Sequence, residues 1–173
     1  MRCVVFGTVF LIASSALAKP PTLDALRAKA QERMHQDAAV YSGKDLGELE
    51  ELYESANRDL KNPEAKAILE RVVKQYPGSN RAGCAVLYLA QLASGPEREK
   101  YLKTAIETHD NTWYGDGVQV GALARTELAK FYAASGHQKE AKSLAAQVAK
   151  RFPGAVDHEG RPLADMLRRL KLL

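Results

Sequence analysis

The chain has 173 residues, of which 46% are hydrophobic and 27% are charged. This is the composition of a globular protein, and it excludes collagen-like, low-complexity and disordered chains. The 25 Lys and Arg residues against 21 Asp and Glu give a net charge of +4, which is too small to indicate a nucleic-acid partner. Two cysteines exclude a disulfide-dense scaffold, and the length allows one domain with a small extension.

The first eighteen residues have the pattern of a secretory signal peptide. A basic start precedes the apolar run 3–13, and small residues occupy the −3 and −1 positions at Ala16 and Ala18. We therefore expect cleavage after Ala18 and secretion by the general secretory route into the periplasm. The alternative is a membrane anchor, but this run spans only about half of a ~30 Å hydrocarbon core. No later stretch approaches 18 apolar residues, so we expect no integral membrane segment after cleavage.

Cys84 is then the single cysteine of the mature chain, because Cys3 lies in the signal peptide. Its apolar neighbours, residues 85–87, indicate a buried, small apolar residue. A reactive thiol is the alternative interpretation.

The mature chain is predicted to be entirely helical. Apolar residues recur at spacings of three and four, and no stretch alternates apolar and polar residues for long enough to form a strand. The first apolar stripe runs from Leu23 to Tyr41, and Asp45 with Glu48 forms a capping-box pattern before a helix over 46–56. Further starts and stops lie at Asn62-Pro63-Glu64, Pro77-Gly78, Gly95-Pro96-Glu97, Gly136 and Pro153-Gly154. These signals predict about eight helices, paired by short turns.

One internal repeat, with an offset of 76 residues, links the segments 65–79 and 141–155. The identical pairs are Ala65/Ala141, Lys66/Lys142, Val72/Val148, Lys74/Lys150, Pro77/Pro153 and Gly78/Gly154. Tyr76 and Phe152 are close substitutes, so both segments end on an aromatic residue followed by Pro-Gly. Unrelated helices share apolar spacing, but they do not usually share this ending at the same phase.

Counting back from each proline gives helix–turn–helix units of 34 residues, 46–79 and 122–155, which is the tetratricopeptide repeat length. The second unit resembles the tetratricopeptide (TPR) family at the signature positions Leu128, Ala129, Tyr132, Gly136, Ala141 and Pro153. In the first unit, Leu60 replaces the turn glycine and Tyr53 stands where a small residue is usual. The stretch from Tyr76 to Ala90 resembles bacterial envelope members of the family. The resemblance implies a short all-α solenoid of antiparallel helix pairs that binds a protein or peptide partner.

The organisation of the chain follows from these units. The middle unit, 80–121, has 42 residues, eight more than 34, and the turn-rich stretch 110–117 supplies the difference as a loop. The expected segments are a signal peptide (1–18), an N-terminal helix (19–45), a TPR-like domain (46–155, units 46–79, 80–121 and 122–155) and a C-terminal capping helix (156–173). That last helix should open at Pro162 and turn Leu163, Met166 or Leu167, Leu170 and Leu173 toward the last unit. An amphipathic helix on a membrane surface is the alternative.

Two groups of residues are candidates for partner binding. Trp113 and Tyr114 lie in the inserted loop, where an exposed aromatic pair beside glycine is typical of a contact hot spot. In the alternative, Trp113 folds back and fixes the loop onto the helices. The basic residues Arg81, Arg125 and Lys130 are expected to line the groove of the solenoid and hold acidic groups of a peptide. Their alternative is an ordinary solvated face.

The sequence carries no pattern that predicts an enzyme. The four histidines form no metal-ligand spacing, no serine lies in a G-x-S-x-G context, and no glycine-rich loop follows a strand. His109-Asp110 with Asp116, and Asp157-His158-Glu159, are interpreted as a helix end and a polar loop. We therefore expect no catalysis, no cofactor and no metal.

Two functions remain as hypotheses. The first is a secreted adaptor that binds a partner segment in its groove through shape and a few polar contacts. The second is a structural subunit of an envelope assembly, joined through its end faces without a groove ligand. A helper domain for an enzyme on another chain is a third hypothesis.

Overall fold

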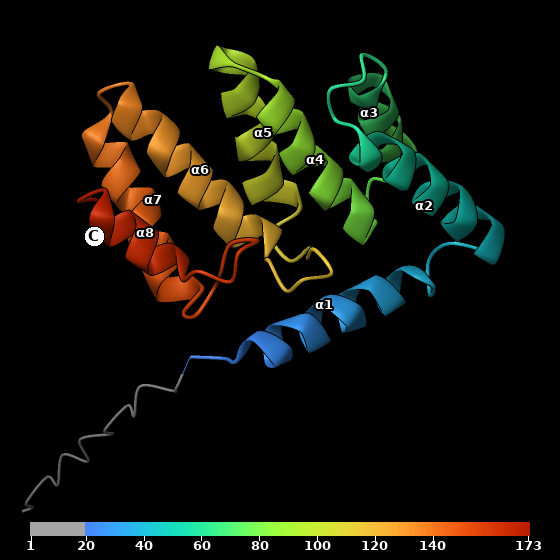
Figure 1. Ribbon diagram of the computed structural model, residues 1–173, viewed down its shortest axis with the longest axis horizontal. Helices are drawn as coiled ribbons and strands as arrows, with labels where there is room; N and C mark the ends of the chain where they lie inside the picture. Colours follow the sequence, from blue (N-terminus) through green and yellow to red (C-terminus); the bar gives the residue numbers. More distant parts are fainter. Residues whose placement is uncertain (1–19) are drawn as a thin grey trace, which may run out of the picture.

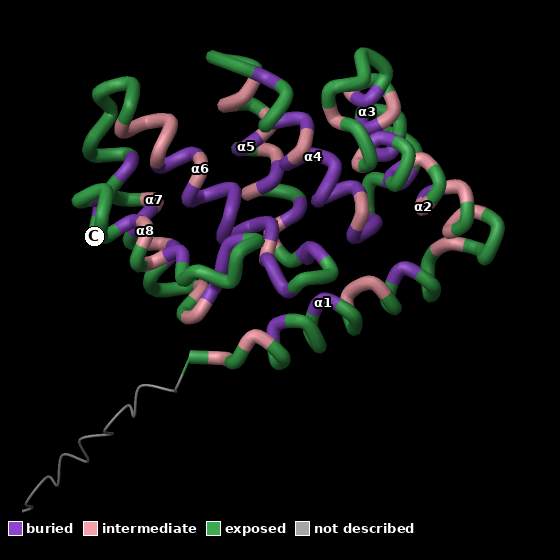
Figure 2. The backbone as a smooth tube through the Cα atoms, viewed as in Figure 1, coloured by how far each residue is buried: buried purple, intermediate pink, exposed green. Residues whose placement is uncertain are grey.

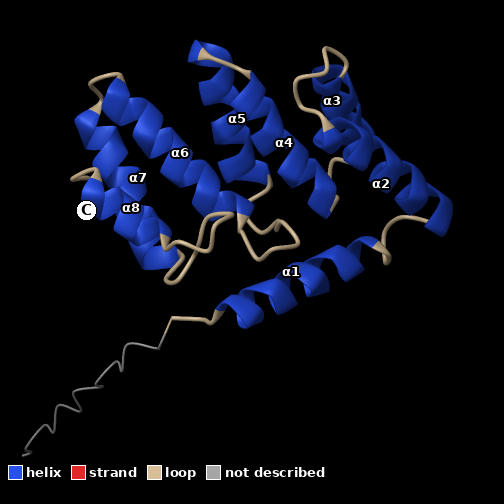
Figure 3. Cartoon of the chain, viewed as in Figure 1, coloured by secondary structure: helices blue, strands red, loops and turns tan. Residues whose placement is uncertain are grey.

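The computed structural model describes residues 20–173, and this part of the chain contains helices and no β-strand (Figures 1 and 3). Its helices are α1 (Leu23–Asp37), α2 (Gly43–Arg58), α3 (Ala65–Gln75), α4 (Asn80–Leu92), α5 (Gly95–Thr108), α6 (Val120–Ala134), α7 (Gln138–Arg151) and α8 (Leu163–Arg169). The signal peptide predicted at residues 1–18 lies outside the described residues.

Helices α2 to α8 form a row in which each packs against the next along the chain (Figure 1). Helices α2, α4, α6 and α8 also contact one another in succession, and we call them the even-numbered layer. Helices α3, α5 and α7, the odd-numbered layer, do not contact one another to the same extent. The row is therefore spaced more closely in the even-numbered layer and curves toward it. The predicted fold class, a short all-α solenoid of helix pairs, is confirmed.

The core is supplied mainly by α4 and α6, which have nine buried residues each (Figure 2). Both helices have neighbours on several sides, so they are apolar around most of their circumference. Ala129 of α6 and Ala141 of α7 have no exposed surface, as expected for small residues where two helices approach closely.

Helix α1 does not belong to the row but crosses its lower edge in Figure 1, where the turns between successive helix pairs lie. At one end of α1, the Arg33 guanidinium donates to the Gly78 carbonyl (2.8 Å) in the turn after α3. Along its N-terminal half, Leu26 and Ala30 pack with Trp113 of the loop after α5 and Val156 of the loop after α7. The helix therefore touches all three connections between pairs.

The predicted helix boundaries need three corrections. Helix α1 ends at Asp37 instead of reaching Tyr41, whose ring packs edge-on against Tyr76 at a centroid distance of 5.6 Å. The capping box of α2 is formed by Ser42 and Asp45, not by Asp45 and Glu48. Asn62 accepts from the Glu64 N–H at 2.9 Å as part of a turn, and α3 begins only at Ala65.

The tight turn expected at Gly136 is confirmed. Gly136 has φ +83°, a left-handed conformation that glycine adopts without steric cost. The His137 N–H donates to the Tyr132 carbonyl at 2.8 Å, and the Gly136 N–H donates to Ala133 at 3.3 Å. This is a Schellman ending, and it reverses the chain between α6 and α7.

The C-terminal helix caps the row with Leu163 and Leu167, as expected, but not with Leu170 and Leu173. Leu163 and Leu167 are fully buried, whereas Leu170 and Leu173 are 47% and 43% exposed. Lys171 has φ +58°, and the Leu172 N–H donates to the Leu167 carbonyl at 3.0 Å. This second Schellman ending folds Leu172 into the core in place of Leu170 and Leu173.

The internal repeat is preserved in the backbone. Tyr76 has φ −127° and ψ 52°, and Phe152 has φ −128° and ψ 52°; each donates its N–H to the carbonyl four residues earlier at 3.0 Å. The side-chain surroundings differ, because the Phe152 ring lies under the guanidinium groups of Arg125 and Arg151 at 5.0 and 5.2 Å. The two repeated segments therefore share the same backbone path but make different side-chain contacts.

Candidate functional site

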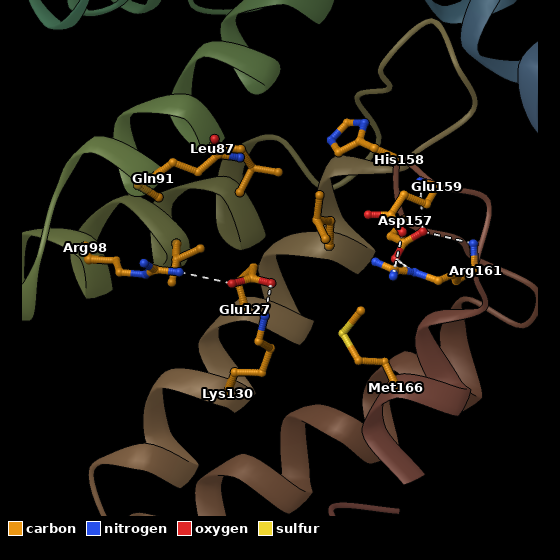
Figure 4. A pocket seen from close by; sticks show the side chains of 13 residues that line it. Leu87, Gln91, Arg98, Glu127, Lys130, Asp157, His158, Glu159, Arg161 and Met166 are labelled. Atoms are coloured by element: carbon orange, nitrogen blue, oxygen red, sulfur yellow. Dashed lines mark hydrogen bonds and ion pairs between the residues drawn. The ribbon is translucent and has the colours of Figure 1, made fainter. Parts of the chain in front are cut away.

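A cavity of about 350 Å³ opens on the even-numbered layer, between α4, α6 and the loop that precedes α8 (Figure 4). We call it the inner cavity. Its apolar lining comes from Leu87, Ala90, Leu102, Leu123 and Met166. Its polar lining comes from Gln91, Arg98, Glu127, Lys130, Asp157, His158, Glu159 and Arg161. A concave site with an apolar floor and polar groups that fix orientation is a candidate ligand site, and here six of the polar residues are charged.

The α5–α6 side of the cavity is a charge cluster centred on Glu127. Its carboxylate accepts from Arg98 at 3.0 Å and from Lys130 at 2.7 Å. Two cations share one carboxylate, so this wall carries a net charge of +1. The Nε–H of Arg98 is buried and finds no hydrogen-bond partner within residues 20–173, which is uncommon for a buried donor.

The opposite wall is the loop before α8, and it carries the opposite charge. Asp157 accepts from the backbone N–H groups of Glu159 (3.0 Å) and Arg161 (2.9 Å) and from the Arg161 Nε (2.7 Å). Burial raises the pKa of Asp157, but these hydrogen bonds outweigh it and hold the pKa below its usual value. Arg161 also pairs with Glu159 at 2.5 Å. Two carboxylates share one guanidinium, so this wall has a net charge of −1.

This loop has a structural counterpart before α6 that the sequence analysis did not recognise. Segments 112–120 and 155–163 follow the same path, each with one isolated antiparallel bridge and a left-handed glycine. Their equivalent backbone bonds are Tyr114 N to Val118 O (2.9 Å) and Asp157 N to Arg161 O (3.0 Å), and Val120 N to Thr112 O and Leu163 N to Ala155 O (both 2.9 Å). The two loops also touch, because His158 Nδ1 lies 2.8 Å from an Asp116 carboxylate oxygen.

The expectation that Trp113 and Tyr114 form an exposed pair is wrong. Each is only 5% exposed. The Trp113 backbone is bound by Asn80, its ring packs under α1, and the Tyr114 hydroxyl donates to the Cys84 carbonyl at 3.2 Å. The alternative describes the structure: the loop folds back because its two aromatic rings find apolar surfaces on α1 and α4.

The three basic candidates are separated. Arg125 is 3% exposed and binds Asp110, Gln147 and the Gly121 carbonyl, so its expected place in an open groove is also wrong. Arg81 is held by Glu50 at 2.7 Å over the ring of Tyr53, away from the inner cavity. Lys130 alone among the five candidates lines that cavity.

Sequence reasoning missed Arg98, Glu127 and Arg161, which form the charged walls. Each lies in a different segment and looks like an ordinary solvated residue in the sequence. A usable signal was the three-residue spacing of Glu127 and Lys130 on one helix, which predicts an ion pair on that face.

Two other kinds of site, a reactive thiol and a metal centre, can be checked in the described part of the chain. Cys84 is fully buried, and burial raises the pKa of its thiol to about 12, as expected for an inert apolar residue. No group of three or more His, Cys, Asp and Glu side chains in residues 20–173 is placed to hold a metal ion.

None of the described helices combines the length and the apolar character that crossing a membrane requires. Comparison of the chain with protein-family models, with curated proteins and with solved structures returns no match.

Proposed function

We propose that the chain is an exported, TPR-like adaptor that holds a segment of a protein or peptide partner in the inner cavity and catalyses no reaction. The observation that carries the proposal is the cavity itself, with its apolar floor between two charged walls. The repeat signature supports the class of protein, and the pattern of residues 1–18 supports export to the periplasm.

The cavity suits binding because its floor is built on packed helices. Leu102 and Leu123, at 1% and 7% exposed, are core residues that also line the floor. A floor made of core residues is already in place before a partner arrives, so little conformational entropy is lost on binding. An apolar partner side chain gains about 25 cal/mol for each Å² removed from water there.

Selection from a peptide library tests the proposal. Residues 19–173 are used to select displayed peptides, whose affinity is then measured for two tryptophan variants of α4. Gln91→Trp fills the cavity from an exposed position, whereas Leu92→Trp places the same ring on the neighbouring residue, which does not line the cavity. Selected peptides should bind Leu92→Trp as they bind the unmodified chain and bind Gln91→Trp at least about ten-fold more weakly. Failure to select any peptide, or equal binding to both variants, contradicts the proposal.

One observation favours the structural subunit as a second candidate. Leu170 and Leu173 are exposed at the end of the row formed by α8, and a stacked array can extend through such an end face. Sedimentation equilibrium tests it. An assembly joined there should dissociate in Leu170→Lys, and a chain that is monomeric at all concentrations contradicts this candidate.

A further inference from the structure

The two walls of the inner cavity face one another with opposite net charges. Arg98, Glu127 and Lys130 lie on one side in Figure 4, and Asp157, Glu159 and Arg161 lie on the other. Met166 and the apolar residues of α4, α5 and α6 line the same cavity. Neither wall is neutralised internally, because each has one unmatched charge.

We propose that the occupant of the inner cavity is an extended peptide segment with an acidic and a basic side chain on either side of an apolar one. The acidic side chain binds at Arg98, the apolar one occupies the floor, and the basic one binds at Glu159. This inference rests on the proposed function and specifies the chemical class of the partner segment.

Arg98 and Lys130 select the acidic group. The Arg98 Nη2 donates to Glu127 at 3.0 Å, and 32% of the Arg98 side chain is exposed. The guanidinium can therefore also form a charge-assisted hydrogen bond with a carboxylate of the ligand. Lys130, whose side chain is 41% exposed, adds a second positive charge at the rim.

Glu159 selects the basic group. The carboxylate of Asp157 is occupied by two backbone N–H groups and by Arg161, so it keeps little capacity for a ligand. Glu159 is 68% exposed and shares Arg161 with Asp157, so its carboxylate can accept an additional ammonium or guanidinium group. His158 is directed to Asp116 of the neighbouring loop at 2.8 Å.

The opposite charges of the two walls also determine which ligands are excluded. A polyanion is attracted to Arg98 and repelled by Glu159, whereas a polycation is attracted to Glu159 and repelled by Arg98. Charges that oppose the wrong ligand contribute as much to specificity as charges that attract the right one. A segment with one charge of each sign satisfies both walls at once, and its apolar residue is buried between them.

Capped peptide pools with a central leucine test the pattern. The mixed pools carry one glutamate and one lysine on opposite sides of the leucine, in both orders and at spacings of one to three residues. The comparison pools have glutamine in place of the glutamate, of the lysine or of both. Fluorescence anisotropy should show at least one mixed pool binding about ten-fold more tightly than its singly charged counterparts. Equal binding of the mixed and the uncharged pools overturns the inference.

Variants of each wall test which wall binds the acidic side chain of the peptide and which binds the basic one. Arg98→Gln and, independently, Lys130→Gln should remove the preference for glutamate and keep that for lysine. Glu159→Gln, at a position too exposed to affect folding, should remove the preference for lysine alone. Lys103→Gln and Glu107→Gln on the outer side of α5 do not line the cavity and should change neither preference. Loss of both preferences in either control variant overturns the assignment.

The two proposals fail in different ways. Peptides that bind the unmodified chain, lose affinity for Gln91→Trp and show no charge preference contradict this inference and leave the adaptor function standing. If neither the library nor any pool yields a ligand, the adaptor function fails, and the inference fails with it.

Discussion

The side-chain amide of Asn80 and the backbone of Trp113 exchange two hydrogen bonds. Asn80 Nδ2 donates to the Trp113 carbonyl and Oδ1 accepts from the Trp113 N–H, both at 2.7 Å. Asn80 has no exposed surface, and its own N–H donates to Asp37 of α1 at 2.8 Å. The first residue of α4 therefore holds both the loop before α6 and the end of α1.

We expect Asn80→Ala to destabilise the fold by about 3 kcal/mol, because it leaves the buried Trp113 N–H without a partner and leaves the Trp113 carbonyl only the weak 3.5 Å bond from the Cys84 thiol. Urea unfolding followed by circular dichroism measures the change. Asn111→Ala is the control: it removes the longer 3.3 Å bond to the Trp113 indole from an exposed position and should cost less than about 1 kcal/mol. Equal effects of the two substitutions would show that the amide exchange is unimportant.

Asp110 neutralises the buried charge of Arg125, which is why Asp110→Ala should be costly. Without Asp110, the guanidinium keeps only Gln147 and the Gly121 carbonyl as partners. We expect a loss of about 3 kcal/mol or more in the free energy of unfolding. Arg151→Ala removes the exposed partner of the same carboxylate and should cost less than about 1 kcal/mol. The prediction fails if the two variants unfold at the same urea concentration.

Replacing either of two helical glycines by alanine should change the stability of the protein, in opposite directions at the two positions. A Cβ at Gly83 of α4 would lie 2.0 Å from Thr112 Oγ1, whereas a Cβ at Gly47 of α2 meets nothing within 4 Å. Gly83→Ala should therefore destabilise the protein by about 1–3 kcal/mol through overpacking, and Gly47→Ala should stabilise it by about 0.5–1 kcal/mol. Thermal melts of both variants provide the test. A stabilising Gly83→Ala would mean that α4 and the loop are not in close contact.

His109 should make stability depend on pH. Burial, and then the positive charge of Arg33, lower the pKa of His109 in the folded protein. The unfolded chain binds this proton near the ordinary value of about 6.5, so the free energy of unfolding should fall as the pH falls below about 6.5. Urea midpoints at pH 7.5 and 5.0 should differ more for the unmodified chain than for His109→Gln. An identical pH dependence of the two proteins contradicts the prediction.

Lys171 offers a stabilising substitution. Its left-handed backbone, φ +58°, costs a residue with a Cβ roughly 1–2 kcal/mol, although glycine also gains entropy in the unfolded chain. Lys171→Gly should raise the free energy of unfolding by about 1 kcal/mol and raise the melting temperature. Lys171→Ala removes the same charge and keeps the Cβ, so it should show no such gain. If both variants melt alike, the charge and not the backbone is responsible.

The helices could be predicted from the sequence because burial follows their periodicity. In α3, the burial of Leu69 and Val72 follows from their three-residue spacing, and the end of the helix follows from the Pro-Gly dipeptide just beyond it. The ending of α8 was missed because nothing in the local sequence indicates a left-handed lysine. The equivalence of the two loops was missed because Gly117 and Gly160 are the one identical pair between their sequences.

The candidate site could be predicted only in part, because it depends on contacts between distant segments. Lys130 was identified, but its partners Glu127 and Arg98 become a wall only when α5 lies beside α6. Trp113 was misplaced for a similar reason. The surface that buries it is on α1, where Leu26 and Ala30 are the buried apolar residues.

Helix α1 has a consequence for how the whole array behaves. In a simple linear array each unit interacts only with its neighbours, so units can melt one at a time from the ends. Here one 15-residue helix touches the connections after α3, α5 and α7 together, so loss of any one pair removes part of the support of the other two. Unfolding of the array should therefore be cooperative over its whole length, and α1 restrains the curvature of the row.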